Sequence, residues 1–213
     1  MTTIDAHSAQ QELAQPAAAA APAVTGDPAL IGLPSFIVGS VALGLVLVGY
    51  VPAAAVGASL PIIVAATGLG LAIAAIWAAA VGQSAVAGVF GIFAGFWWSY
   101  GMLVLGLTHN WFGIVAADVL HTQGLYLISW IVVIGMLTLA TLRLPAAYTV
   151  LFALIEIALV LVLIGTLQQS AGVLKVAGVV VFVFAAVGVY LFFSSGSQAT
   201  GGKALPLGQP LVR

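Results

Sequence analysis

The sequence predicts an all-α integral membrane protein with six transmembrane helices. Of its 213 residues, 63% are hydrophobic and only 4% are charged, whereas soluble domains carry about 25% charged residues. The apolar runs are long and continuous rather than alternating, which favours helices over a β-barrel. Because a helix of roughly 20 residues crosses the hydrocarbon core of a bilayer, the chain has room for about six spans.

The expected organisation is one transmembrane domain between two tails. Residues 1–26 are rich in Ala and Pro and lack the basic start and long apolar run of a signal peptide, so we interpret them as a mobile tail. The transmembrane domain covers residues 27–195, and residues 196–213 form a Ser- and Gly-rich C-terminal tail. The spans are expected at about residues 31–51, 60–81, 85–107, 125–142, 146–167 and 173–193.

Asp27 and Pro28 begin the first span. An Asp side chain accepts hydrogen bonds from the free N–H groups at a helix start, and Pro has the backbone angle of the first helical position. We therefore interpret Asp27 mainly as a helix cap, with the added consequence that its ionised carboxylate would repel an acid at this mouth.

The four basic residues predict the orientation in the membrane. An even number of spans puts both termini on one side, together with Arg143, Lys203 and Arg213, and leaves Lys175 on the other. Because cytoplasmic connections are enriched in Lys and Arg, we expect cytoplasmic termini in a plasma or inner cell membrane. Four basic residues cannot follow a phosphate backbone, so a nucleic-acid partner is excluded, and membrane lipid is the expected surrounding.

The third span contains the most unusual stretch of the chain, GVFGIFAGFWWSYG at residues 88–101. Five aromatic residues in it are candidates for the lining of a solute path: Phe90, Phe93, Phe96, Trp97 and Tyr100. Phe93 and Trp97 are four residues apart and share a helix face. Gly91 and Gly95 form a small-xxx-small pair on another face, suited to close helix contact. The competing interpretation is ordinary core or lipid-facing packing.

Six short motifs follow one another in the order seen in one known family. Asp27–Leu33, which includes Pro28 and Gly32, is similar to an N-P-[AG]-P-L-G-L motif, with Asp in place of Asn. The other matches are a G-N-[TS] turn at 82–84, an F-W pair at 96–97, a Y-L-x-x-W run at 124–130, residues 141–143, and LPLG at 205–208. From about residue 27 to 208 the chain thus resembles the acetate uptake transporters, or succinate–acetate permeases.

The resemblance implies a ring-shaped homo-hexamer in which each six-helix protomer has a path for acetate and similar small monocarboxylates, sometimes succinate. It also implies an apolar constriction near the membrane midplane, formed by Phe36, Phe93 and a residue at or near Ile155. The family carries Tyr where this chain has Phe93, so a hydroxyl that contacts a carboxylate is missing. A second register puts the family's S-Y-G on residues 99–101, but it loses the F-W pair.

Glu156 is the one carboxylate deep inside a span. An ionisable group in a membrane is costly, which makes it a functional candidate. It follows Ile155 directly and so points about 100° away from the expected constriction. Three interpretations stay open: a proton-titrating group coupled to the solute, a hydrogen-bonded strut between helices or protomers, and a neutral buried acid.

Other kinds of site find little support. The spacing of His109, Asp118 and His121 is not that of a metal-binding pair, so no metal is expected. With no cysteine, no Ser–His–carboxylate set and no phosphate-binding loop, we expect neither an enzyme nor a cofactor. The remaining aromatic residues fit an interfacial belt: Trp111, Phe112, Tyr126, Trp130 and Tyr190.

The expected function is a channel or permease for acetate-like monocarboxylates, with proton coupling left open. A bare carboxylate in a low-dielectric path needs donors or positive potential to replace its water. The alternative is a channel for a neutral solute such as urea or a short amide, which an all-apolar constriction would suit. A structural membrane protein that transports nothing is the further alternative.

Overall fold

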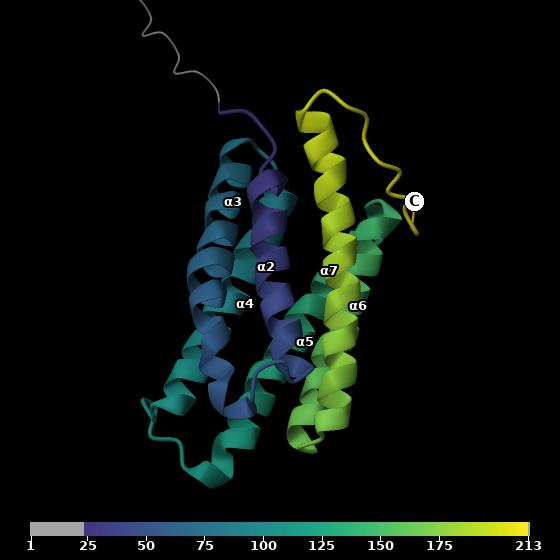
Figure 1. Cartoon of the computed structure of the whole chain (residues 1–213). Helices are drawn as coiled ribbons and strands as arrows, with labels where there is room; N and C mark the ends of the chain where they lie inside the picture. The colour runs from purple at the N-terminus through teal and green to yellow at the C-terminus, as the bar shows by residue number, and fades with distance from the viewer. Residues whose placement is uncertain (1–23, 213) are drawn as a thin grey trace, which may run out of the picture.

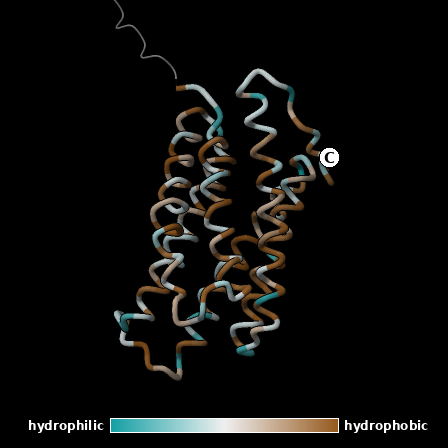
Figure 2. Tube along the Cα trace, viewed as in Figure 1, coloured by the Kyte–Doolittle hydropathy of each residue, from teal (hydrophilic) through white to brown (hydrophobic). Residues whose placement is uncertain are grey.

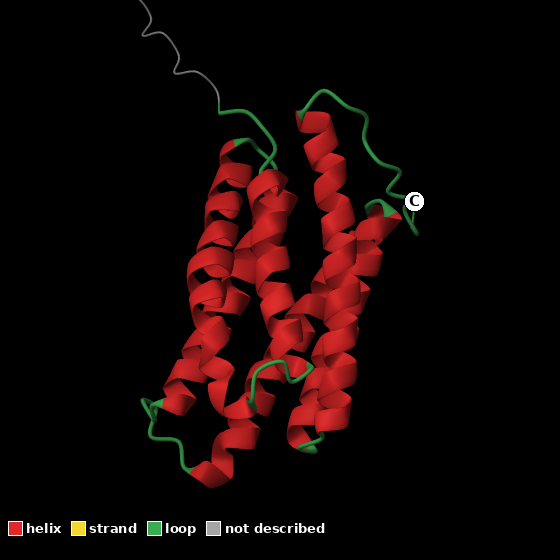
Figure 3. Cartoon of the chain, viewed as in Figure 1, coloured by secondary structure: helices red, strands yellow, loops and turns green. Residues whose placement is uncertain are grey.

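A computed structural model describes residues 24–212 of the chain. Every regular element in that range is a helix (Figure 3), and six helical segments are long and apolar enough to cross a membrane. This confirms the predicted all-α membrane fold with six spans. Five of the spans are regular α-helices: α2 (Ala29–Leu47), α4 (Ser84–Thr108), α5 (Val119–Ala140), α6 (Ala146–Leu167) and α7 (Ala171–Ala199). Two short 3₁₀ turns and the second span make up the other elements in this range.

The second span is not one regular helix. It begins with a 3₁₀ segment, η1 (Ala53–Ser59), continues as a π-helix, η2 (Ile62–Gly68), and ends as α3 (Leu69–Ala80). The wider π turn is stabilised from the neighbouring helix, because the indole Nε1 of Trp98 in α4 donates a hydrogen bond of 3.2 Å to the carbonyl of Val64. The sequence predicted a single span here but not the π segment, which is rare and costs backbone regularity.

The helices follow one another around the bundle (Figure 1). α3 packs on α4 and on α2, α2 packs on α7, α7 on α6, and α6 on α5. The ring closes where Tyr126 and Trp130 of α5 pack on Phe96 of α4, with ring centroids 5.8 and 5.3 Å apart. The six spans therefore surround an interior, and this interior holds the candidate site.

The outer surface of the bundle suits a lipid environment. Apolar residues run along the length of the helices in Figure 2, and large hydrophobic side chains such as Ile76, Leu125 and Met136 are exposed. α5 is the least buried of the six spans. Since a soluble protein would bury such side chains, their outward placement identifies a multi-pass membrane protein.

Several helix ends differ from the predicted ones, and the second span begins at Ala53 rather than near residue 60. α2 ends at Leu47 rather than near Val51. α5 begins at Val119, inside what was expected to be loop, and the hydroxyl of Thr122 donates to the carbonyl of Asp118 in its first turn. α7 continues to Ala199 because the polar residues near its end bond back to the helix, as when Gln198 Nε2 donates to the carbonyl of Ser194. Polar composition alone does not end a helix when the polar side chains donate to carbonyl groups of the preceding turn.

Residues 200–212, the C-terminal strap, are tied to the bundle rather than free of it. The strap's Leu205 N–H donates to the buried hydroxyl of Ser194 at 3.1 Å. The Leu207 carbonyl accepts from the N–H of Ala147 at 2.9 Å, and the Pro206 carbonyl accepts from the hydroxyl of Tyr190 at 2.8 Å. The strap therefore joins the end of α7 to the start of α6.

Candidate functional site

The interior contains two cavities. The upper cavity has a volume of about 370 Å³ and is lined by residues near the starts of α2, α4 and α6 and near the ends of α5 and α7, among them Asp27, Gln83, Thr141, Ser195 and Gln198. The lower cavity, of about 550 Å³, is lined by the opposite ends of these helices, among them Thr108, Gln123, Thr166, Gln169 and Lys175. The two cavities therefore lie toward opposite ends of the bundle.

Aromatic rings separate the two cavities, which share no lining residue. Phe93 lies at the centre of this aromatic constriction: its ring centroid is 5.3 Å from that of Phe36, 5.8 Å from that of Phe152 and 6.3 Å from that of Phe96. All three pairs have interplanar angles between 65° and 75°, the edge-to-face arrangement that aromatic rings prefer. Phe184 completes the constriction with its ring 5.7 Å from that of Phe36.

Residues predicted for the constriction come from three helices and meet at the floor of the upper cavity. Phe36 of α2, Phe93 of α4 and Ile155 of α6 all line that cavity and are at most 5% exposed. Phe90, one turn before Phe93, lines the same cavity, and it packs on Gly32, where a Cβ would overlap its ring. The helix-start motif, Asp27 to Leu33, thus supplies part of the cavity wall.

Two residues of the constriction were missed from the sequence. Phe152 precedes Ile155 by three residues, so a helix face containing Ile155 also contains Phe152; this spacing was a usable signal. Phe184 lies in α7 and has no such signal, because its contact with Phe36 depends on how α7 packs on α2.

Trp97 does not line the cavity beside Phe93, contrary to the sequence-based interpretation. It lines neither cavity and is only 1% exposed. One turn further along α4, a Cβ on Gly101 would lie 2.8 Å from Cγ2 of Val64, so this face of α4 packs closely on η2. Phe96 and Tyr100 line the lower cavity instead.

Gly91 and Gly95 do not form a close seam within the chain. A Cβ on Gly91 would lie 3.7 Å from Cβ of Ala75 in α3, and one on Gly95 would lie 3.8 Å from Trp130 in α5. These are ordinary contacts with two different helices, and Gly91 is exposed. The tight helix contact on α4 is at Gly101.

Asp27 caps the first helix and also lines the upper cavity. Its Oδ1 accepts a hydrogen bond of 2.9 Å from the N–H of Ala29, which is the contact of a helix cap. It also lines the upper cavity, where it is the one charged residue of the lining. Its carboxylate therefore gives this cavity a negative charge.

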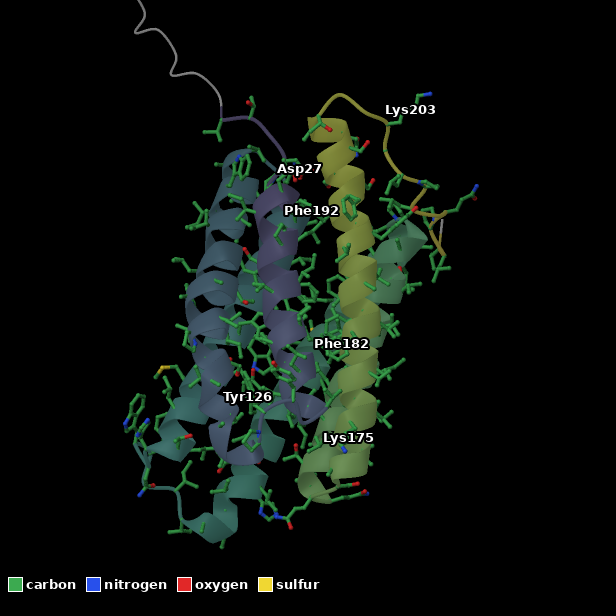
Figure 4. The ribbon with its side chains drawn as sticks, in the orientation of Figure 1. Asp27, Tyr126, Lys175, Phe182, Phe192 and Lys203 are labelled. Carbon is green, nitrogen blue, oxygen red and sulfur yellow. The ribbon has the colours of Figure 1, made fainter. Side chains whose placement is uncertain are left out.

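The lower cavity is larger and carries the opposite charge. Lys175, on the first turns of α7, is the one charged residue of its lining, and it lies at the other end of the bundle from Asp27 (Figure 4). Tyr126 also lines it, and its hydroxyl donates a 2.8 Å hydrogen bond to the carbonyl of Phe96. Tyr126 and Trp130 pack inward on Phe96, so their assignment to an interfacial belt was wrong.

Glu156 lies outside both cavities. Its side chain points toward α5, with Oε1 3.7 Å from the position of a Cβ on Gly135. Oε2 is buried and makes no hydrogen bond within the described part of the chain. The neighbouring Ile155 lines the upper cavity, so the two residues face different surroundings.

The loop between α4 and α5 shows no arrangement for a metal. Among residues 24–212, no group of three His, Asp or Glu side chains is close enough to hold an ion. His109 instead stacks on Trp111, with ring centroids 5.6 Å apart and planes 21° apart. Trp111 and Phe112 are more than half exposed.

Six apolar spans around two cavities, separated by aromatic rings, define the architecture of a multi-pass membrane transport protein. The chain belongs to the GPR1/FUN34/yaaH family, whose family model matches residues 10–201. This confirms the resemblance found in the sequence motifs. The family, and the protein of known structure described below, are transport proteins rather than enzymes.

The fold is shared with a protein of known structure, described as the bacterial acetate channel SatP. The two chains superpose with a TM-score of 0.75 at 23% sequence identity, and the match covers 86% of this chain and 99% of the other. No protein of curated function matches the sequence.

Proposed function

We propose that this chain forms a transmembrane path for acetate and similar small carboxylates. The observation that carries the proposal is the aromatic constriction between two cavities at opposite ends of the bundle. Membership of the family and the fold shared with a bacterial acetate channel support the choice of solute. Phe36, Phe93 and Ile155, with Phe152 and Phe184, act as the gate.

The gate is closed in this arrangement of side chains. Phe36, Phe93, Phe152 and Phe184 are each at most 5% exposed and touch one another. No charged residue belongs to the constriction, so a carboxylate that enters it loses water with only the positive ring edges in exchange. Passage then requires the rings to turn aside, and it favours a small solute with one charge at most.

The same apolar gate gives a reason to keep the neutral-solute alternative. Phe93 offers no hydroxyl to a carboxylate, and urea or a short amide crosses an apolar constriction at a lower desolvation cost than an anion. Acetate flux measured against pH and voltage distinguishes a carboxylate path from a path for a neutral solute. Acetate flux that ignores both quantities contradicts an ion or proton-coupled path, and liposomes impermeable to all small solutes favour a structural protein.

We also propose that protomers assemble into a homo-hexamer with cytoplasmic termini. Support comes from the exposed apolar face of α5 and from Gly91, which leaves α4 open to close approach by a neighbour. Mass measurement of the detergent-extracted complex tests the assembly, and protease protection of a terminal tag tests the orientation.

The gate is tested with labelled acids in proteoliposomes. Phe93→Ala and Phe36→Ala remove rings from the constriction, so both variants are expected to admit longer acids, raising butyrate uptake relative to acetate by about tenfold. Phe193→Ala is the matched control, because Phe193 is 60% exposed on the outer surface of α7. Unchanged uptake of both acids by both gate variants removes these residues from the gate.

A further inference from the structure

The two cavities carry opposite charges. Each charge comes from a single residue of the cavity wall and not from the net charge of the chain. Asp27 is the one charged residue that lines the upper cavity, and Lys175 is the one that lines the lower cavity. The chain as a whole has a net charge of only −1. Figure 4 shows the two side chains at opposite ends of the bundle.

We propose that the lower cavity is an anion-collecting vestibule, in which Lys175 draws a small carboxylate toward the aromatic constriction. The proposal rests on the proposed function for the identity of the anion. Lys175 acts as a positioning residue for the solute, and neutral hydrogen-bonding side chains such as Gln123 and Gln169 line the same cavity.

The walls of the lower cavity strengthen the effect of this one charge. Much of the lining is aliphatic, including Leu103, Leu107 and Leu120. Low-dielectric walls concentrate the field of a charge inside a cleft and raise the local concentration of its counter-ion. The lining contains no carboxylate that would cancel the charge of Lys175.

The position of Lys175 in the sequence agrees with such a role. It is the one basic residue expected on the side of the membrane opposite the termini, where the usual enrichment of Lys and Arg does not apply. A cation that attracts a solute anion gives a physical reason for a lysine at this end. Anchoring to a lipid phosphate is the competing use of a lysine near a helix end.

The potential in each cavity can be measured without transport, because the chain contains no cysteine. We would place single thiols with Gln123→Cys in the lower cavity and Gln83→Cys in the upper one. Each variant is treated separately with two methanethiosulfonate reagents, one carrying a negatively charged sulfonatoethyl group and one carrying a positively charged trimethylammonioethyl group. The ratio of the two reaction rates reports the local potential.

Lys175→Gln is expected to lower the negative-to-positive rate ratio at position 123 by about threefold to tenfold at low salt, and to leave the ratio at position 83 unchanged. Lys175→Arg keeps the ratio, and high salt weakens the difference by screening. Lys203→Gln is the matched control, since both lysines are exposed but Lys203 lines neither cavity. An unchanged ratio at position 123 overturns the proposal and leaves lipid anchoring.

A transport measurement separates this proposal from the proposed function. In acetate-transporting proteoliposomes, Lys175→Gln raises the half-saturating acetate concentration severalfold at low salt, and Lys203→Gln does not. Equal values for the two variants overturn the role of Lys175 while acetate transport stands. A wild-type protein that moves no carboxylate contradicts the proposed function, and the thiol rates then still decide whether the cavity attracts anions.

Discussion

Two faces of α4 differ in how tightly they are packed. The path face, Phe90 and Phe93, borders the upper cavity, so its rings have space on one side. The packing face contains Trp97, which is 1% exposed, and Gly101, where a Cβ would come within 2.8 Å of Val64 in the π segment η2. One helix thus divides two tasks between its faces, and substitutions on the two faces should have different consequences.

Trp97→Ala should have the largest effect on stability, because it empties a fully packed position. Loss of a buried Trp costs about 3–5 kcal/mol of unfolding free energy. Thermal unfolding in detergent measures the loss, with Trp111→Ala as the control because Trp111 is 56% exposed. If the two variants unfold at the same temperature, the packing face is not the more tightly held one.

Adjacent residues of α6 extend the comparison to a second helix. Ile155→Ala should raise acetate flux severalfold because it widens the floor of the upper cavity, whereas Glu156→Gln should change flux by less than about twofold between pH 5 and 8, since Glu156 lines neither cavity. Uptake measured against pH checks both. A pH profile flattened by Glu156→Gln would show that Glu156 titrates during transport.

Tyr126→Phe should produce a smaller change, confined to stability. The variant loses the hydrogen bond from the hydroxyl to the carbonyl of Phe96, which is worth about 1 kcal/mol. Unfolding temperature measures it, with Tyr50→Phe as the control because Tyr50 is 76% exposed. A loss of acetate transport at wild-type stability would instead make this hydroxyl part of the path.

Gly91→Ala should have the smallest effect and the opposite sign. A Cβ there meets nothing closer than 3.7 Å, and Ala is favoured over Gly in a helix by up to about 1 kcal/mol. Gly101→Ala is the paired variant, expected to destabilise because its Cβ meets Val64. If Gly91→Ala breaks the oligomer without destabilising the protomer, Gly91 belongs to a contact between protomers.

The sequence was sufficient for features that depend on composition and on local chemistry. Continuous apolar runs predicted six spans, and Asp27–Pro28 predicted the start of the first helix within two residues. The motif register predicted that Phe36 and Phe93 lie together, and their ring centroids are 5.3 Å apart. These features depend on short segments whose physical preferences point in one direction.

Features that depend on tertiary packing were not predictable in the same way. Four residues of a helix turn through about 400°, so Trp97 is rotated by about 40° from Phe93 and lies one turn further along α4, and it lines neither cavity. The π segment itself depends on a hydrogen bond from Trp98, 34 residues away. The C-terminal strap is held largely through backbone groups, as at Leu205 and Leu207, which composition does not reveal.

The packing of the first span on the last has a consequence for the order of assembly. α2 and α7 form one of the two most extensive helix contacts in the bundle, yet they are the earliest and latest spans to be synthesised. At 5–20 residues per second, the ribosome needs roughly 10 to 30 seconds to reach the end of α7 after α2. Phe93 of α4 is made earlier, but throughout that time Phe36 lacks its other aromatic neighbour, Phe184 of α7. Closure of the ring is therefore a late, post-insertion event.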